Sequence, residues 1–154
     1  GPGGGPLRRR RGMNTMEKPV LSSLLRINRY HRKVLRCALA PYQYVGVMHL
    51  IVLYINRNPG SSQEEITGFY ALDKASVARD ARRLEDLGHI QRNKMPENRR
   101  QYRLYLTDAG RDMIRIIDRA AEQFQKILAA SISTEDWAQL ELLLKRLEEN
   151  VRLP

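Results

Sequence analysis

The stretch that decides the fold is Leu72 to Thr107, LDKASVARDARRLEDLGHIQRNKMPENRRQYRLYLT. Its first half predicts a helix over 74–87, because Asp73 is a typical N-cap residue and Gly88 a typical residue after a helix end. Its second half alternates weakly over 89–94 and again over 102–106, with a Pro-containing turn between them. The stretch therefore predicts a helix followed by a basic β-hairpin.

Two further helices are predicted before this stretch. Ser62 and Glu65 have the spacing of a capping box, which predicts a short helix from Ser62 to about Ala71. A more apolar helix precedes it, opening at Pro41 and ending at Asn58-Pro59-Gly60. Two short helices joined by a tight turn and followed by a basic hairpin are typical of a winged helix-turn-helix.

Long helices are predicted on both sides of this unit. Apolar residues recur at helical spacing over 20–39, and again over 107–130 after the N-cap candidate Thr107. A last helix begins near Ser133, with Asp136 in capping-box position. The fold class is therefore mainly α with a small β-hairpin wing.

The first twelve residues differ from the rest of the chain. They contain five glycines, two prolines and the run Arg8 to Arg11, a composition that cannot build a packed element. We interpret residues 1–12 as a leader left from recombinant expression. The alternative is a basic arm that enters a DNA groove. We expect one domain over 13–154, with the winged helix-turn-helix at about 41–106.

Charge and cysteine content narrow the class of function. The formal net charge is +10, and without the four leader arginines it is still +6, from 23 basic and 17 acidic residues. Such a balance favours a polyanionic partner. The single cysteine, Cys37, excludes an intramolecular disulfide. No signal-peptide or membrane-span pattern is apparent, so we expect a cytoplasmic location.

The helix after Asp73 is the candidate recognition helix, because a helix fits the major groove and its first turns reach base edges. Arg79 is placed to bind guanine through two hydrogen bonds, and Ala75 to contact a thymine methyl. The alternative is that the charges only solvate an exposed face. We predict contacts to duplex DNA from Lys74, Ala75, Ser76, Arg79, Arg82 and Arg83.

The hairpin carries the second set of predicted DNA contacts, at Arg92, Lys94, Arg99 and Arg100. Arg99 is the preferred tip residue, because an arginine can enter a narrow A·T-rich minor groove. Arg100 lies either beside it or turned back to support the loop. Ser61, Ser62 and Gln63 are also placed to donate to phosphate, although simple capping explains the serines equally well. An ordinary charged hairpin is the alternative.

Three short motifs make the chain resemble the MarR family. LEDLGHIQR at 84–92 is similar to the family's Leu-Glu-x-x-Gly-x-Ile-x-Arg, and LTDAG at 106–110 to its Leu-Thr-x-x-Gly. NRR at 98–100 resembles the family's Asp-x-Arg wing, but Asn98 replaces the aspartate. Asn98 is therefore expected to orient Arg100 only through neutral hydrogen bonds. The resemblance covers about 20–151.

The resemblance implies a homodimer in which the helices at about 20–39 and 107–152 pair with a second subunit. Two recognition helices about 34–36 Å apart would then bind a pseudo-palindromic site. It also implies a repressor that releases DNA when a small aromatic effector binds between the dimerisation helices and the wing domain. The residues that fall near that junction are His31, Tyr42, Tyr44 and His49.

Other functions are alternatives to sequence-specific DNA binding. Cys37 is interpreted as a buried structural thiol, and a peroxide-sensing role is the alternative that one branch of the family suggests. The three histidines have no metal-ligand spacing, and neither a nucleophile elbow nor a phosphate loop is apparent. We therefore predict no enzyme activity, no cofactor and no metal. A winged-helix module that binds protein or RNA is the runner-up.

Overall fold

A computed structural model describes residues 18–98 and 100–151. The predicted leader at 1–12 and the predicted wing-tip residue Arg99 lie outside this part of the chain. The elements in chain order are α1 (Pro19–Leu39), the 3-10 turn η1 (Ala40–Tyr42), α2 (Met48–Arg57), α3 (Gln63–Tyr70), α4 (Lys74–Asp86), β1 (Ile90–Lys94), β2 (Tyr102–Leu106), α5 (Asp108–Ala129) and α6 (Thr134–Asn150). The predicted mainly α fold with a hairpin wing is confirmed.

Side-chain caps set the start of four helices, as the sequence predicts. Each cap oxygen accepts a hydrogen bond from the main-chain N–H three residues later, which satisfies one of the unpaired donors at a helix start. The donor–acceptor pairs are Glu65 to Ser62, Ser76 to Asp73, Gly110 to Thr107 and Asp136 to Ser133.

The predicted start of the second helix at Pro41 is wrong. Pro41 lies in η1, and the chain then turns before α2 begins at Met48. Gly46 adopts a left-handed backbone, with φ of 54°, which interrupts any continuous helix here. The N–H of Val47 donates to a carboxylate of α4, Asp80, at 2.8 Å. The start of α2 is thus set by a residue that lies 33 positions away in sequence.

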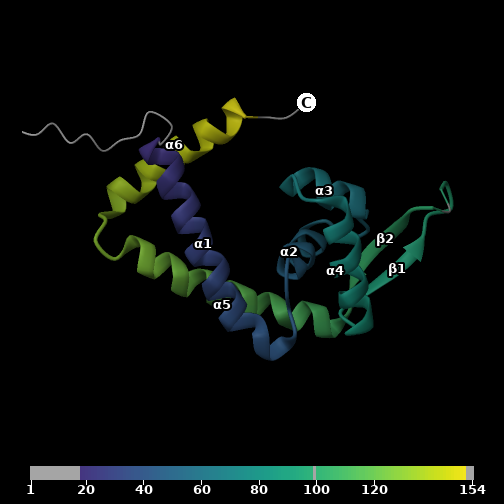
Figure 1. Cartoon of the computed structure of the whole chain (residues 1–154). Coiled ribbons are helices and arrows are strands. Elements are labelled where there is room, and N and C mark those ends of the chain that lie inside the picture. Colours follow the sequence, from purple (N-terminus) through teal and green to yellow (C-terminus); the bar gives the residue numbers. More distant parts are fainter. Residues whose placement is uncertain (1–17, 99, 152–154) are drawn as a thin grey trace, which may run out of the picture.

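The core surrounds α2, which contacts α4, α5 and β2. Its side chains Met48, Ile51 and Val52 are completely buried. Further fully buried apolar side chains come from the helices and the strand packed around it: Ile66, Val77, Ala81, Leu84 and Leu104. In Figure 1, α2 to α4 and the hairpin form one lobe, while α1 and α6 lie on the other side of the molecule.

The hairpin is joined to the helix-turn-helix through the main chain. β1 and β2 are antiparallel, with Arg92 opposite Leu104. Leu104 also pairs with the turn between α2 and α3: its N–H donates to Ser61 and its carbonyl accepts from Gly60, both at 2.8 Å. The wing is therefore fixed to the turn that precedes α3.

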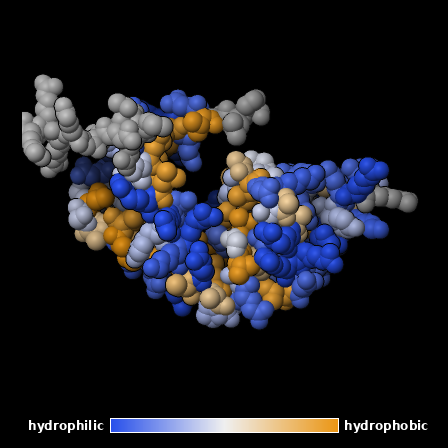
Figure 2. All heavy atoms as spheres, viewed as in Figure 1, coloured by the Kyte–Doolittle hydropathy of each residue, from blue (hydrophilic) through white to orange (hydrophobic). Residues whose placement is uncertain are grey.

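Long helices outside this lobe expose apolar side chains. α1 crosses α5 in Figure 1, and α6 carries no buried residue. Figure 2 shows orange, apolar side chains along α6. Large apolar residues exposed on these helices include Val20, Leu21, Leu25, Ile127, Leu142 and Leu147, and Val151 is exposed directly after α6. None of the helices within the described ranges is long and apolar enough to cross a membrane.

Candidate nucleic-acid interface

The outer face of α4 is polar, cationic and free of core contacts. Val77, Ala81 and Leu84 turn one side of the helix into the core, which leaves the opposite side exposed. Of the predicted contact residues, Lys74, Ala75, Arg79, Arg82 and Arg83 are exposed, whereas Ser76 is half-buried. Figure 2 shows hydrophilic side chains over this helix and the hairpin.

Two features of this face add to the sequence analysis. Ala78 is exposed between Ala75 and Arg82, and spacing of three and four residues already places it on their side of the helix. The hydroxyl of Ser76 donates to the capping carboxylate of Asp73 at 2.9 Å. Ser76 therefore supports the helix start, and Ala75 and Ala78 leave room for close approach of a partner.

Arg79 and Arg83 share an acidic neighbour that the sequence analysis did not single out. The carboxylate of Asp80 is 1% exposed and lies 3.0 Å from an Nη of Arg83. The Nε of Arg79 lies 3.9 Å from the same oxygen. Both arginines remain about half exposed, so their guanidinium groups also face solvent. The helix pattern did contain a signal for Asp80, because spacing of three and four residues places it on the buried side with Val77 and Leu84.

Arg92, at the base of the wing, is held by two partners. Its Nε lies 2.5 Å from Glu85, and its guanidinium carbon lies 4.8 Å from the centre of the Tyr102 ring. The side chain is 27% exposed. These contacts connect the last turn of α4 to both strands. Arg92 therefore stabilises the position of the wing, and it also lies on the predicted DNA-binding face.

The wing loop has exposed cations and one internal hydrogen bond. Lys94 and Arg100 are exposed, as a DNA-contact role requires. Asn98 does form a neutral hydrogen bond to Arg100, but its Oδ1 accepts from the main-chain N–H, at 3.0 Å. Asn98 thus shapes the loop backbone and does not orient the guanidinium of Arg100.

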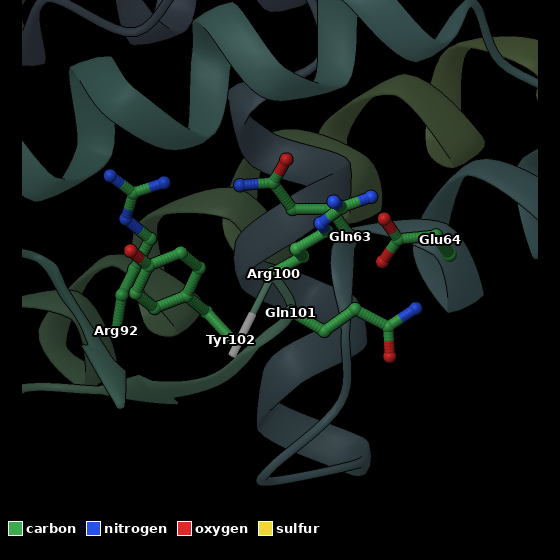
Figure 3. Close-up of a pocket in the computed structure, with 6 residues that line it drawn as sticks. All are labelled: Gln63, Glu64, Arg92, Arg100, Gln101 and Tyr102. Atoms are coloured by element: carbon green, nitrogen blue, oxygen red, sulfur yellow. The ribbon is translucent and has the colours of Figure 1, made fainter. Parts of the chain in front are cut away.

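A cavity of about 140 Å³ separates the start of α3 from the wing. Figure 3 shows its lining residues converging from both elements, with the Tyr102 ring beside Arg92. The six lining residues are Gln63, Glu64, Arg92, Arg100, Gln101 and Tyr102. Three of them were predicted to contact DNA, and the cavity adds Gln101 and Tyr102 to the same surface.

Ser61 and Ser62, by contrast, are buried. Ser62 accepts from the N–H of Glu65 at 3.2 Å and is 4% exposed, which is the capping role given as an alternative. Ser61 is 3% exposed, and its hydroxyl has no hydrogen-bond partner within the described residues. Gln63 is half-buried at the cavity edge and is the one of the three that reaches the surface.

The four residues assigned to an effector site separate into different surroundings. His31 stacks on Phe124 of α5, with ring centres 4.6 Å apart. Burial, together with the charge of the neighbouring His31, lowers the pKa of His49 to about 4. The two histidines therefore lie together where α1, α2 and α5 meet.

The two tyrosines of that set do not join the histidines. Tyr42 is exposed on η1. Tyr44 is 2% exposed, and its hydroxyl is 2.6 Å from Nδ1 of His89, at the base of the wing. Burial raises the pKa of Tyr44 and lowers that of His89. Tyr44 thus connects the turn after η1 to the wing.

The interpretation of Cys37 as a buried thiol is wrong, because its side chain is exposed on α1. Residues at helical spacing alternate between core and solvent, and Cys37 falls between the buried Leu35 and Leu39.

Among residues 18–98 and 100–151, no three His, Cys, Asp or Glu side chains gather in a way that could hold a metal ion.

Comparison with known proteins shows which proteins share this sequence and fold. Residues 48–102 match the sequence profile of the MarR family. A crystal structure of MarR is 33% identical, covers 88% of this chain and 100% of its own, and superposes with a TM-score of 0.79. The HTH-type transcriptional regulator BilQ of Clostridioides difficile (strain CD3) is 26% identical over 102 residues, which is 66% of this chain and 69% of BilQ.

A more distant structure shares the fold. A MarR family transcriptional regulator from Listeria monocytogenes, crystallised in complex with a 26mer DNA, has a TM-score of 0.81 at 20% identity. The match covers 88% of this chain and 90% of that protein.

The fold, the outward face of α4 and the basic wing define a transcriptional regulator with a DNA-binding winged helix-turn-helix. The 33% sequence identity to the MarR structure, over the whole length of that structure, identifies the family of regulators more narrowly. The chain belongs to the MarR family. Members of this family are transcriptional regulators and not enzymes, as predicted.

Proposed function

We propose that this chain is a cytoplasmic homodimer that binds a pseudo-palindromic duplex DNA site and represses transcription until a small aromatic effector binds. The observation that carries the proposal is the outward face of α4. Lys74, Ala75, Arg79 and Arg82 are exposed there, while the opposite side of the same helix is buried in the core. A helix so presented fits the major groove.

The contacts have different expected roles. Arg79 is the candidate for base recognition, because a well-aligned arginine–guanine pair contributes about 1–3 kcal/mol of discrimination. Arg82 and Arg83 lie one turn further along and are expected at phosphates. Lys94, Arg99 and Arg100 are the candidates for the wing, which would enter the minor groove. These assignments apply the general geometry of the fold to the exposed residues.

A second copy of the chain would cover the apolar side chains of α1, α5 and α6. Leu25 and Val151 are each 71% exposed in the single chain, and Ile127 is 55% exposed. Contiguous apolar patches are uncommon on monomeric proteins and usually mark an interface. Pairing through these helices leaves α4 and the wing of each copy free for DNA.

Selection of bound sequences from a random duplex library tests the DNA-binding proposal. Wild-type protein at near-physiological salt should enrich a two-fold symmetric motif. Arg79→Ala should lose preference at one position in each half-site. Arg119→Ala is the matched control, because Arg119 is an exposed arginine on α5 and is not among the residues proposed to contact DNA. Binding without any enriched motif would refute sequence-specific recognition and favour a module for RNA or protein.

The effector proposal rests on the histidine pair at the junction of α1, α2 and α5. His31 and His49 are half-buried, and His31 packs flat against Phe124. A flat aromatic ligand would replace that stacking contact. Phenolic compounds that release DNA from wild-type protein should lose this effect in His31→Ala, while Tyr42→Ala, on exposed η1, should respond normally. Equal loss or equal retention in both variants would remove this site from consideration.

A further inference from the structure

Asp80 is a buried carboxylate on the core-facing side of α4. Its carboxylate is 1% exposed, although basic residues flank it on the same helix. Charged side chains are almost never fully buried unless they are paired and hydrogen-bonded. Its partners therefore indicate its role.

The two carboxylate oxygens face different elements. Oδ2 accepts from the N–H of Val47, at the start of α2, at 2.8 Å. Oδ1 accepts from Arg83 at 3.0 Å, and Arg79 lies 3.9 Å away. One oxygen thus fixes α4 to α2, and the other draws the guanidinium groups of α4 toward one point.

The loop before α2 is shaped to admit this carboxylate. Gly46 has a φ of 54°, and a Cβ on this residue would collide with Oδ2 of Asp80. That oxygen belongs to a side chain fixed by two bonds, so it cannot easily move aside. The left-handed glycine, the N–H of Val47 and the buried carboxylate therefore form one fitted contact.

We propose that Asp80 is a positioning residue for DNA recognition, fixing the recognition helix on α2 and holding Arg83, and more loosely Arg79, in set directions. The proposal rests on the proposed function of α4. A restrained arginine loses less side-chain entropy when it binds its correct partner, and it adapts less easily to an incorrect one. The negative charge also offsets one cation on this surface, which weakens sequence-independent attraction to DNA.

Asp80→Asn tests the ion pair between the Asp80 carboxylate and Arg83. Asparagine has nearly the same shape and retains an oxygen for the N–H of Val47, but it no longer attracts Arg83. Binding to a selected site and to a scrambled duplex is measured over a range of salt concentrations. We expect affinity for the scrambled duplex to rise about five-fold at physiological salt, as for one additional phosphate contact. The preference for the selected site should fall about ten-fold.

Asp86→Asn is the matched control. Asp86 is exposed on the same helix, so the variant makes the same change in net charge. It should raise scrambled-duplex affinity similarly and leave the preference for the selected site unchanged. If Asp80→Asn and Asp86→Asn behave alike, Asp80 does not position the arginines and the inference is overturned. If wild-type protein itself shows no preference, the proposed function fails instead, and the inference with it.

A second variant keeps the test decisive if Asp80→Asn does not fold. Arg83→Lys preserves the charge of both partners and changes only the geometry at a half-exposed position. It should retain native circular dichroism and total charge. The preference for the selected site should fall several-fold, because the phosphate contact of Arg83 sets the orientation in which Arg79 meets the bases. An unchanged preference would show that the direction of Arg83 has no role in recognition, which refutes the inference.

Discussion

Replacement of Gly110 by alanine should destabilise the protein, although alanine is normally the better helix residue. Gly110 is buried in the first turn of α5, and a Cβ there would collide with the main-chain carbonyl oxygen of His89. Alanine in a helix gains about 0.5–1 kcal/mol over glycine when nothing opposes it. Here a main-chain oxygen opposes it, and overpacking of this kind costs about 1–3 kcal/mol.

The collision also disturbs hydrogen bonds at the junction of wing and helix. The His89 carbonyl accepts from the N–H of Thr107 at 3.0 Å, and the Thr107 hydroxyl donates to the Gly88 carbonyl at 2.6 Å. Loss of one such bond costs about 1 kcal/mol. We therefore expect Gly110→Ala to lower the free energy of unfolding by about 2 kcal/mol, and the melting temperature by about 4–8 °C.

Gly68→Ala provides the matched control, because Gly68 is in α3 and no atom lies within 4 Å of its added Cβ. This variant should gain about 0.5–1 kcal/mol. Urea unfolding followed by circular dichroism, at one fixed protein concentration, measures both changes. If Gly110→Ala is as stable as Gly68→Ala, the close approach of α5 to His89 is refuted.

Three other predictions follow from separate parts of the structure. Burial holds the pKa of His49 at about 4, below the ordinary 6.5, so the unfolded chain takes up this proton first and stability is lost as pH falls from about 6.5 to 4. His49→Gln should flatten that part of the pH profile, by up to roughly 3 kcal/mol, and an unchanged slope would contradict it. Asp73→Ala removes the N-cap of α4 and should lower the free energy of unfolding in urea by about 1 kcal/mol. An unchanged free energy of unfolding would show that this cap does not stabilise the helix. Ile127→Glu, at a 55% exposed site on α5, should shift sedimentation from dimer to monomer without unfolding the chain; a persistent dimer would place the interface elsewhere.

Local chemistry explains why most elements could be predicted. The start of α4 depends on Asp73, that of α5 on Thr107 and that of α6 on Ser133, and each cap lies next to the helix it serves. The hairpin likewise follows from alternation on both sides of a turn. Such signals are complete within a few residues, so a single sequence contains them.

Long-range contacts explain what could not be predicted. The start of α2 depends on Asp80, which belongs to another helix. Its spacing from Val77 and Leu84 places it on the buried side of α4, but no local pattern indicates that its partner is Val47. Tyr44 was grouped with His31 and His49 by position, but its hydroxyl is directed to His89. The side on which Cys37 lies depended on the exact phase of α1. In the first two cases the hydrogen-bond partner lies tens of residues away in sequence. For Cys37, a small error in the phase of the helix reverses the expected burial.

The pairing of Leu104 with Gly60 and Ser61 constrains how a regulatory signal could act. Because the β-strands are hydrogen-bonded to the α2–α3 turn, and Arg92 joins Glu85 of α4 to the Tyr102 ring, the wing cannot swing independently of the recognition helix. A shift at α1 and α5 is therefore expected to move the wing and the recognition helix together. If the chain forms the proposed dimer, a change in half-site spacing would disengage the proposed major-groove and minor-groove contacts of one subunit simultaneously, which favours all-or-none release over gradual loss of contacts.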